Sequence, residues 1–349
     1  MFLSFSLYNF GMSNEPQRHH YIPQFILKNF SNEQNQLLYW DVRKKTLSSR
    51  NPKSVFMNFH MYRDEKNHPD DPTIIEKMFS AFEGEIANLL RDKFIEQDEI
   101  VITRAELEKL RIFMGLLSFR SDLRMNQYKQ KNFDSRTEEI LSLYEPNQNF
   151  EDLWKRELFV LTKCRSIKDV EDNNEIDEII KTDFLNLVQG FYLTIVDARG
   201  GEFILSDIYP TLEVFNLMPN VNIHLHELYP ISSTRMILLN HIMFKKGANH
   251  NNPIINSMVK RSKIGENMIK EPKSKRVNSF NVFSPEDIFI YKPVKIYEND
   301  LIYINELILN EARNGIMFKN KERIFKSVKC FNERGDTKQK HNELEKALQ

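Results

Sequence analysis

The chain has 349 residues, which is enough for one large domain or two modest ones with a sizeable hydrophobic core. Lysine plus arginine and aspartate plus glutamate each number 49, so the formal net charge is zero and no global field attracts polyanions. The two cysteines, Cys164 and Cys330, stand alone in the sequence. Their isolation excludes a disulfide scaffold and a zinc-ribbon site, and it favours a reducing, cytoplasmic compartment.

The N-terminal stretch Met1–Phe10 is apolar and aromatic, but it has neither the basic start nor the small-residue cleavage site of a signal peptide. It is also too short to cross a bilayer. We therefore interpret residues 1–17 as an extension ahead of the fold, with Met12 as an alternative start. No later run is apolar and long enough for a transmembrane helix, so we predict a soluble protein with no membrane partner.

The first predicted elements after this extension are strands. Leu37–Asp41 and Thr46–Ser48 flank a basic turn and are typical of a β-hairpin, and a third extended piece lies within Val55–Tyr62. We expect a small antiparallel sheet with His19 and His20 near one of its ends.

A series of amphipathic helices follows the small sheet. Thr73 is predicted to cap a helix that ends near Phe94, and Thr103 with Glu106 predicts a capping box for the next helix. Apolar residues at helical spacing predict three more helices, at Ile140–Tyr144, Leu153–Cys164 and Ile176–Tyr192.

Strand patterns then return. Leu193–Val196 and Glu202–Ser206 flank a glycine turn, and two more strand-like runs follow at His224–Tyr229 and Met236–His241. Residues 244–281 are polar and basic and predict a long loop or a partly helical insertion, and Asp300–Lys319 is the last predicted helix.

This order of elements is typical of an α+β protein rather than an alternating α/β one. We expect a predominantly helical fold with a small N-terminal antiparallel sheet and a second set of strands near residues 193–241. A charged C-terminal tail is expected at residues 321–349.

Two adjacent imidazoles precede a proline and an amide near the start of the predicted fold. This block resembles the opening His-His-x-x-Pro-Gln of an uncharacterised family, domain of unknown function 4238. The residues that carry the resemblance are His19, His20, Pro23, Gln24, Leu27, Asn29 and Phe30, then Phe203–Asp207, Tyr229–Ser232, Ile304, Asn305, Ala312 and Arg313. After Asp207 the chain has Ile208-Tyr209-Pro210 where the family more often has Asn-Pro. The resemblance implies a single domain over residues 18–320 and brings no established activity with it.

His19 and His20 support two interpretations. Imidazole changes charge near neutral pH, so either side chain could act as a metal ligand or a general base. Neighbours in a strand point to opposite faces, so only one of them would enter a given pocket. In the structural interpretation, one histidine packs in the core and bonds to the main chain while the other is solvated.

Asp207 and Ser206 end a predicted strand before a chain reversal. A carboxylate at that place could serve a site, but it could equally cap the turn, because aspartate side chains bond to nearby backbone amides. We prefer the turn role for Ser206 and leave both roles open for Asp207.

Arg120 and Arg124 follow the apolar stripe of a predicted helix. A buried, unpaired charge is costly, so these guanidinium groups need acidic partners, such as Glu83 or Asp207, or an anionic ligand. We favour a structural ion pair between helices, with a phosphate or carboxylate clamp as the alternative.

Three patterns carry less weight. Asn51 and His60 have tolerable spacing for an HNH nuclease motif, although the intervening hairpin does not suit that compact module. His224 and His226 are expected on one face of a strand, with Glu227 on the other, and two ligands without a third make a poor metal site. The basic segment Lys260–Arg276 could contact a phosphate backbone but is more typical of a solvated loop.

The leading hypothesis is a nuclease-like hydrolase that acts on a phosphodiester, with a defence or toxin role. In this hypothesis a polar pocket gathers His19, His20, Gln24, Asp207 and Arg120, with Glu83, Arg124, Ser206 and Asn305 as further candidates. His19, His20 and Asp207 would hold a divalent metal ion or move protons, and Arg120 would stabilise the anionic transition state on a nucleic acid or another phosphate-bearing partner. The alternative is a non-catalytic binding module for an anionic ligand, with a structural His-His motif.

Overall fold

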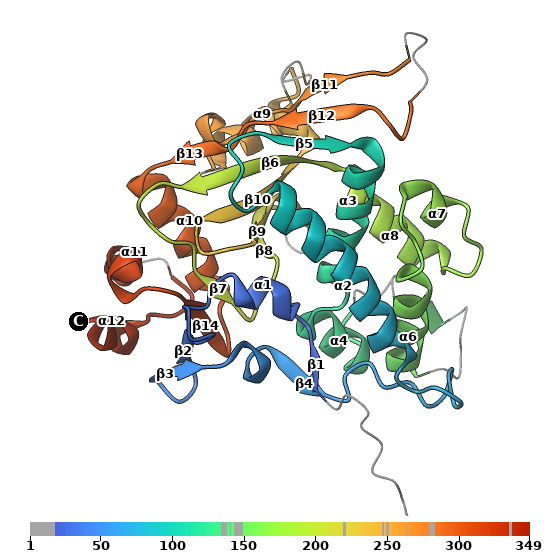
Figure 1. Ribbon diagram of the computed structural model, residues 1–349, viewed down its shortest axis with the longest axis horizontal. Helices are drawn as coiled ribbons and strands as arrows, with labels where there is room; N and C mark the ends of the chain where they lie inside the picture. The colour runs from blue at the N-terminus through green and yellow to red at the C-terminus, as the bar shows by residue number, and fades with distance from the viewer. Residues whose placement is uncertain are drawn as a thin grey trace, which may run out of the picture.

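The computed structural model describes residues 18–133, 138–139, 141–142, 149–218, 221–245, 248, 251–262, 264–278, 283–334 and 337–349 (Figure 1). The expected extension at residues 1–17 lies outside them, as do Ile140 and Tyr144 of one expected helix.

The largest sheet in the described part of the chain has five strands in the order β13-β6-β10-β9-β8. All neighbours are antiparallel except β13, which runs parallel to β6. Its strands are β6 (Phe191–Ala198), β8 (Thr211–Met218), β9 (Val221–Pro230), β10 (Arg235–His241) and β13 (Val294–Ile296). The predicted strands at Leu193–Val196, His224–Tyr229 and Met236–His241 lie in this sheet. The predicted hairpin of Leu193–Val196 with Glu202–Ser206 was wrong, because Leu205 and Ser206 pair with Met317 and Ile316 in another sheet.

Three smaller sheets join segments that are far apart in the sequence. A four-stranded sheet has the order β3-β2-β14-β7, a three-stranded sheet has the order β11-β12-β5, and β1 pairs with β4. The strands are β1 (Arg18–His20), β2 (Leu37–Asp41), β3 (Thr46–Arg50), β4 (Met57–Phe59), β5 (Ile100–Thr103), β7 (Leu205–Ser206), β11 (Lys273–Lys275), β12 (Ile288–Tyr291) and β14 (Gly315–Phe318).

The helices lie on two sides of these sheets, with α2, α3, α4, α6, α7 and α8 at the right of Figure 1 and α10, α11 and α12 at the left. Their bounds are α1 (Gln24–Lys28), α2 (Ile74–Lys93), α3 (Arg104–Phe119), α4 (Asp122–Lys129), α6 (Phe150–Leu161), α7 (Ile167–Glu171), α8 (Glu178–Gln189), α9 (Pro253–Arg261), α10 (Glu298–Glu311), α11 (Lys321–Glu333) and α12 (Asn342–Leu348). Short 3-10 turns occur at η1 (Pro52–Ser54), η2 (Ile242–Phe244) and η3 (Glu266–Met268).

The helix caps follow the sequence signals in part. The predicted capping box of Thr103 and Glu106 is present at the start of α3. Thr73 stands at the N-cap of α2, but its hydroxyl donates to Asp71 Oδ1 at 2.9 Å instead of accepting from the helix.

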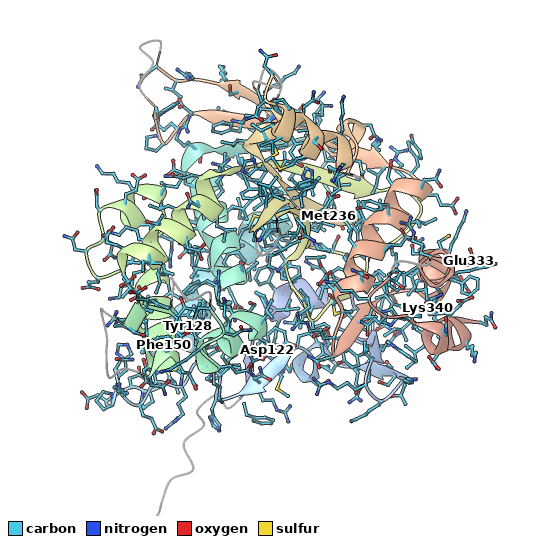
Figure 2. The ribbon with its side chains drawn as sticks, turned by 180° about the vertical axis from the view of Figure 1, so that it is seen from behind. Asp122, Tyr128, Phe150, Met236, Glu333 and Lys340 are labelled. Carbon is cyan, nitrogen blue, oxygen red and sulfur yellow. The ribbon has the colours of Figure 1, made fainter. Side chains whose placement is uncertain are left out.

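Two hydrophobic clusters form most of the core. One lies among α2, α3, α6 and α8, where Trp154 is fully buried and its Nε1 donates to the carbonyl of Phe119 at 3.0 Å. The other lies between the five-stranded sheet and the C-terminal helices and contains Ile304, Phe331 and Met236. Met236 is labelled in Figure 2. None of the described helices is both long and apolar enough to cross a membrane.

The expected predominance of helices with one small N-terminal sheet was wrong. The described residues form four sheets, and the N-terminal hairpin is half of a four-stranded one. Strands β5 and β14 are short and adjoin helices, so their pattern of apolar residues was too short to predict a strand. Their partners, β12 and β2, are distant in the sequence, which no local pattern reveals.

The C-terminal region also differs from expectation. Helix α10 ends at Glu311, and the rest of the expected final helix contains strand β14. Residues 321–349, expected as a charged tail, contain α11 and α12, which bury Ile324, Val328 and Leu344. The high charge of this segment lies on the solvent faces of amphipathic helices.

A register shift between β8 and β9 separates two histidines that alternation would place together. Glu213 pairs with His226 and Val214 pairs with His224, so Leu225 is an extra residue in β9. His226 Nδ1 lies 2.9 Å from Asn240 Oδ1, whereas His224 lines a different cleft together with Glu227. The expectation that His224 and His226 share a face was wrong because this bulge interrupts the two-residue period.

Gly315 of β14 packs against Tyr39 of β2, and this contact provides a test of the four-stranded sheet. A Cβ atom on Gly315 would lie 2.2 Å from Tyr39 Oη. We expect Gly315→Ala to reduce the free energy of unfolding by about 1–3 kcal/mol because the side chain overpacks this contact. Gly84 in α2 has open space around it, so Gly84→Ala should raise stability by about 0.5–1 kcal/mol. Urea denaturation of both variants checks this, and equal effects would contradict the packing argument.

Candidate functional site

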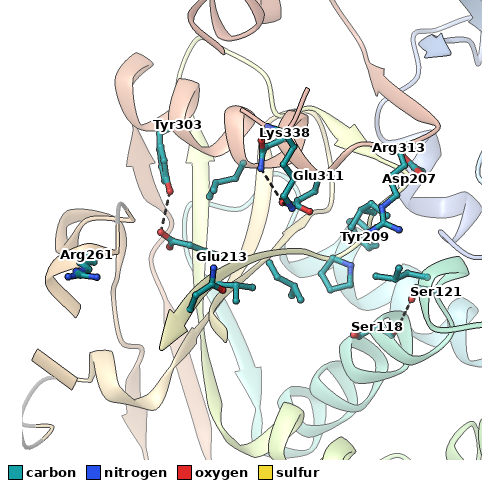
Figure 3. Close-up of a pocket in the computed structure, with 18 residues that line it drawn as sticks. Ser118, Ser121, Asp207, Tyr209, Glu213, Arg261, Tyr303, Glu311, Arg313 and Lys338 are labelled. Carbon is teal, nitrogen blue, oxygen red and sulfur yellow. Dashed lines mark hydrogen bonds and ion pairs between the residues drawn. The ribbon is translucent and has the colours of Figure 1, made fainter. Parts of the chain in front are cut away.

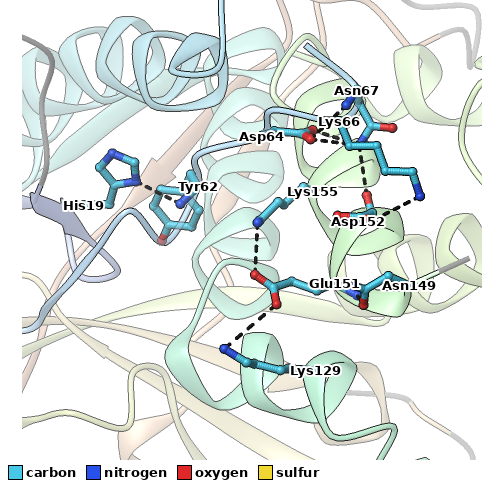
Figure 4. Close-up of polar contacts among 10 residues, drawn as sticks. All are labelled: His19, Tyr62, Asp64, Lys66, Asn67, Lys129, Asn149, Glu151, Asp152 and Lys155. Atoms are coloured by element: carbon cyan, nitrogen blue, oxygen red, sulfur yellow. Dashed lines mark hydrogen bonds and ion pairs between the residues drawn. The ribbon is translucent and has the colours of Figure 1, made fainter. Parts of the chain in front are cut away.

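The first histidine of the motif is part of the core. His19 is fully buried, and its Nδ1 accepts a hydrogen bond from the backbone N–H of Tyr62 at 2.8 Å (Figure 4). The two rings stack with their centroids 5.5 Å apart. This contact ties β1 to the segment after β4, as the structural interpretation of the motif describes.

The second histidine is also buried, at 5% exposure. Its Nδ1 accepts from Gln24 Nε2 at 3.3 Å. Burial, and after it the positive charge of Arg120, lowers the pKa of His20 to about 4, while hydrogen bonds to the main chain of Pro52 and Lys53 oppose this shift. The imidazole of His20 is therefore neutral at neutral pH.

Arg120 is held by the residues around it. Its guanidinium donates to Glu83 Oε1 at 2.6 Å, to the Tyr62 hydroxyl at 3.2 Å and to the main-chain carbonyl of His20. It also lies over the Phe79 ring at 3.9 Å. The structure thus contains the expected ion pair with Glu83, and this pair anchors the His-His block to α2 and α3.

Arg124 belongs to a different group of residues. Its guanidinium contacts Asp183 Oδ2 and Gln127 Oε1, both at 3.0 Å. Arg120 and Arg124 therefore have separate acidic partners instead of forming one clamp.

Asp207 organises the loop that joins α10 to β14. Its Oδ1 accepts from the backbone N–H groups of Arg313, Asn314 and Gly315 at 2.9, 3.0 and 3.2 Å. Its Oδ2 accepts from the side-chain amide of Asn314 at 2.8 Å. We call residues Arg313–Gly315 the Asp207 loop. Both carboxylate oxygens are used inside the protein, but the backbone amides that they accept from belong to a loop 106 to 108 residues further along the chain and not to the chain reversal next to Asp207.

Two other predicted residues also bond within the scaffold. The Ser206 hydroxyl accepts from the backbone N–H of Ile208 at 3.3 Å. Asn305 accepts from the N–H of Ile204 at 3.0 Å and donates to the carbonyl of Glu202 at 2.9 Å.

The expected grouping of His19, His20 and Asp207 does not occur in any of the three clefts described below. Across the described ranges, no three histidine, cysteine, aspartate or glutamate side chains converge so that they could hold a metal ion. Asn51 of the HNH-like spacing caps η1 by accepting from the N–H of Lys53 at 3.0 Å.

A central cleft of about 570 Å³ opens on one side of the Asp207 loop (Figure 3). Asp207 and Arg313 line one end, and Glu213 accepts from the Tyr303 hydroxyl at 3.2 Å at the other. Lys338 forms an ion pair with Glu311 between them. Its charged residues are three acids and three bases (Asp207, Glu213, Glu311, Arg261, Arg313 and Lys338), so it favours neither sign.

A second cleft of about 460 Å³, which we call the hairpin cleft, lies beside β2 and β3 and reaches Asn314 of the Asp207 loop. Its residues are Tyr21, Tyr39, Asp41, Arg43, Lys44, Arg50, Ser54, Val55, Phe56, Met57, Asn58, Asp122 and Asn314. Burial raises the pKa of the Tyr21 phenol, and the charges of Asp207 and Asp122 raise it further. Tyr21 therefore stays a neutral hydrogen-bond donor close to both acids.

The acids of the hairpin cleft accept hydrogen bonds within the protein, whereas two of its cations have no carboxylate partner among the described residues. Asp122 accepts from Asn58 Nδ2 at 2.5 Å, and Asp41 accepts from the backbone N–H of Lys44 at 2.8 Å. Within the described residues, neither Arg43 nor Arg50 has a carboxylate partner, and Arg50 donates to Ser48 Oγ at 2.9 Å. The sequence analysis named neither arginine as a candidate; Arg43 is part of the basic hairpin turn, whereas Arg50 lies outside it, at the end of β3.

The role of Asp207 predicts a loss of stability on mutation. Asp207→Ala removes the acceptor of four hydrogen bonds, and we expect the free energy of unfolding to fall by about 3 kcal/mol. Asp207→Asn keeps the oxygen that faces the three backbone amides, so its loss should be smaller. Urea denaturation, with hydrogen exchange at Arg313–Gly315, measures both. Unchanged exchange in Asp207→Ala would contradict the role.

The pKa of His20 predicts a pH dependence of stability. The folded-state pKa of about 4 lies below the ordinary value of 6.5, so the unfolded chain binds the proton more readily. Stability attributable to His20 is complete above pH 6.5 and decreases as the pH falls towards 4, by up to about 3 kcal/mol. His20→Gln, which cannot titrate, should show a shallower decline than the native chain in unfolding measured from pH 7 to pH 4. Equal loss of stability in the native chain and in His20→Gln as the pH falls would contradict the role of His20.

Comparison with known proteins supports the resemblance noted in the sequence. No curated protein and no solved structure matches the chain. A family model described as "Protein of unknown function (DUF4238)" matches residues 18–322, which is most of the chain and close to the expected span of 18–320. The chain therefore belongs to the DUF4238 family.

Proposed function

We propose that this protein is a non-catalytic binding module that holds a phosphate-bearing anionic ligand in the hairpin cleft. The observation that carries this proposal is the pair of arginines, Arg43 and Arg50, that face the cleft without carboxylate partners in the described chain. The planar guanidinium group suits phosphate because it can donate two parallel hydrogen bonds.

The rest of the cleft supports an anion. Asp122 and Asp41 are already hydrogen-bonded, which reduces their repulsion of a negative ligand. Lys44 adds a third positive charge, so the lining carries three cations against two acids (Arg43, Lys44 and Arg50 against Asp41 and Asp122). The hydroxyl of Tyr21 adds a neutral donor.

The motif residues hold the walls of this cleft in place. His19 fixes β1 against the chain after β4, and the N–H of Tyr21 donates to the carbonyl of Phe56 at 3.2 Å. Asp207 fixes Asn314 on the opposite wall. Under this proposal the His-His block and Asp207 act on the ligand through the scaffold.

Binding is favoured over hydrolysis of the same ligand. A hydrolase needs a group that can take a proton from water. No histidine is among the residues that line the hairpin cleft, and its two carboxylates serve the scaffold.

Calorimetric titration tests the proposal with pyrophosphate and with a short single-stranded oligonucleotide as separate probes. We expect the native chain to bind pyrophosphate, and Arg43→Ala and Arg50→Ala each to weaken binding about tenfold, since a charged hydrogen bond contributes about 1.5–3 kcal/mol. A variant with both Arg43→Lys and Arg50→Lys should bind more tightly than the alanine variants but more weakly than the native chain. Lysine keeps the positive charge but lacks the planar guanidinium group.

Arg91→Ala is the matched control. It removes the same side chain from an exposed position in α2 that does not line the hairpin cleft, so affinity should not change. Tighter binding of the oligonucleotide than of pyrophosphate would assign the cleft to a nucleic-acid backbone. If the double alanine variant binds both probes as the native chain does, the proposal is wrong.

A further inference from the structure

A third cleft, of about 470 Å³, is lined by residues of the five-stranded sheet and of helices α3, α4 and α8. We call it the sheet cleft. Its polar lining comes from β9, β10, α4 and α8 and includes His224, Glu227, His241, Arg124 and Asp183. The bulge in β9 brings His224 and Glu227 to this one cleft. It shares no residue with the hairpin cleft.

Only one of the two carboxylate oxygens of Glu227 has a hydrogen-bond partner among the described residues. The side chain is fully buried, and its Oε2 accepts from the Tyr229 hydroxyl at 2.8 Å. Its Oε1 is buried too and has no hydrogen-bond partner among the described residues. An ionised carboxylate in such a place is costly unless a cation joins it.

The neighbouring groups do not supply that cation. Arg124 is paired with Asp183 at 3.0 Å, so these two charges largely offset each other. Burial lowers the pKa of His224 and of His241, so both imidazoles are neutral at neutral pH. The phenol of Tyr229 is neutral as well, because burial raises its pKa well above the ordinary value.

Glu227 therefore holds a proton more strongly than an ordinary glutamate. Burial raises its pKa to about 7, the hydrogen bond from Tyr229 opposes this rise, and the nearby charge of Asp183 adds to it. When that proton leaves, the cleft carries one uncompensated negative charge next to neutral imidazoles and the ring of Phe191.

We propose that the sheet cleft binds the protonated amino group of a small organic amine, with Glu227 as its carboxylate acceptor. The ammonium donates to the unpaired oxygen of Glu227 and takes the place of the proton that the carboxyl group held. Phe191 lines the same cleft, and an aromatic ring suits the same charge. This site is separate from the anion site proposed for the hairpin cleft and does not depend on it.

Titration with n-butylammonium, with n-butanol as the uncharged probe of similar shape, tests the site. We expect the native chain to bind the amine and not the alcohol. Binding should weaken about tenfold for each pH unit below 7 and level off above it, because the proton and the ammonium compete for Glu227. Equal binding of both probes, or no binding of the amine at any pH, would overturn the proposal.

Glu227→Gln keeps the shape of the side chain and removes its charge, so it should reduce amine binding at pH 8 at least tenfold. Glu157→Gln is the matched control. Glu157 is also fully buried, has a pKa raised to about 7 by burial and does not line the sheet cleft, so its replacement should leave amine binding unchanged. Native-like affinity in Glu227→Gln would contradict the assignment.

A second measurement needs no variant, in case Glu227→Gln fails to fold. Binding of the amine at pH 6.5 should release more than about half a proton per ligand, because Glu227 is mostly protonated at that pH. Calorimetry of the native chain in two buffers with different ionisation enthalpies measures this release. Binding without proton release would rule out Glu227 as the acceptor.

Discussion

The carboxylate of Asp207 is the interaction on which the arrangement of the described chain most depends. One oxygen receives three consecutive backbone N–H groups, and the other receives the side chain of Asn314. This fixes the turn that ends α10 and starts β14, and so it sets the register of β14 between β2 and β7. The central cleft and the hairpin cleft share this turn as a wall, with Arg313 on one side and Asn314 on the other.

The His-His block makes a similar contribution from the other end of the chain. His19 accepts from a backbone amide, and the main chain of His20 accepts from Arg120, whose charge is balanced by Glu83. These contacts are internal and leave few polar atoms for a ligand. The groups that remain available for recognition are on the neighbouring hairpin and on the faces of the large sheet. Under the proposed function, the sequence signature marks the residues that support the hairpin cleft and not those that would contact its ligand.

The sequence predicted elements whose signals are local. The capping box at Thr103, the hairpin of β2 and β3 and the amphipathic helices follow from spacing and side-chain chemistry within a few residues. It also named Glu83 as one of two candidate partners of Arg120, with Asp207 as the other, because a buried guanidinium requires an acid nearby, and the ion pair forms with Glu83. These inferences needed no knowledge of distant contacts.

The parts that could not be predicted depend on distant partners or on one-residue changes of register. Strand β5 pairs with β12, and β14 pairs with β2 on one side and β7 on the other. The extra residue Leu225 places His224 on the opposite face of the sheet from His226. The cleft around Glu227 could therefore not be predicted from the two-residue alternation of a regular strand. Arg43 and Arg50 were missed because an unpaired charge is recognisable only when the surrounding acids are in place.

The position of β14 has a consequence for synthesis of the chain. Strand β2 has β14 on its inner side, yet Gly315 leaves the ribosome long after Leu37. Until then, one edge of the early hairpin has unpaired backbone groups, and its apolar residues lack their cover. Closing so long a segment is slow compared with local folding. The four-stranded sheet can therefore be completed only after most of the chain has been synthesised.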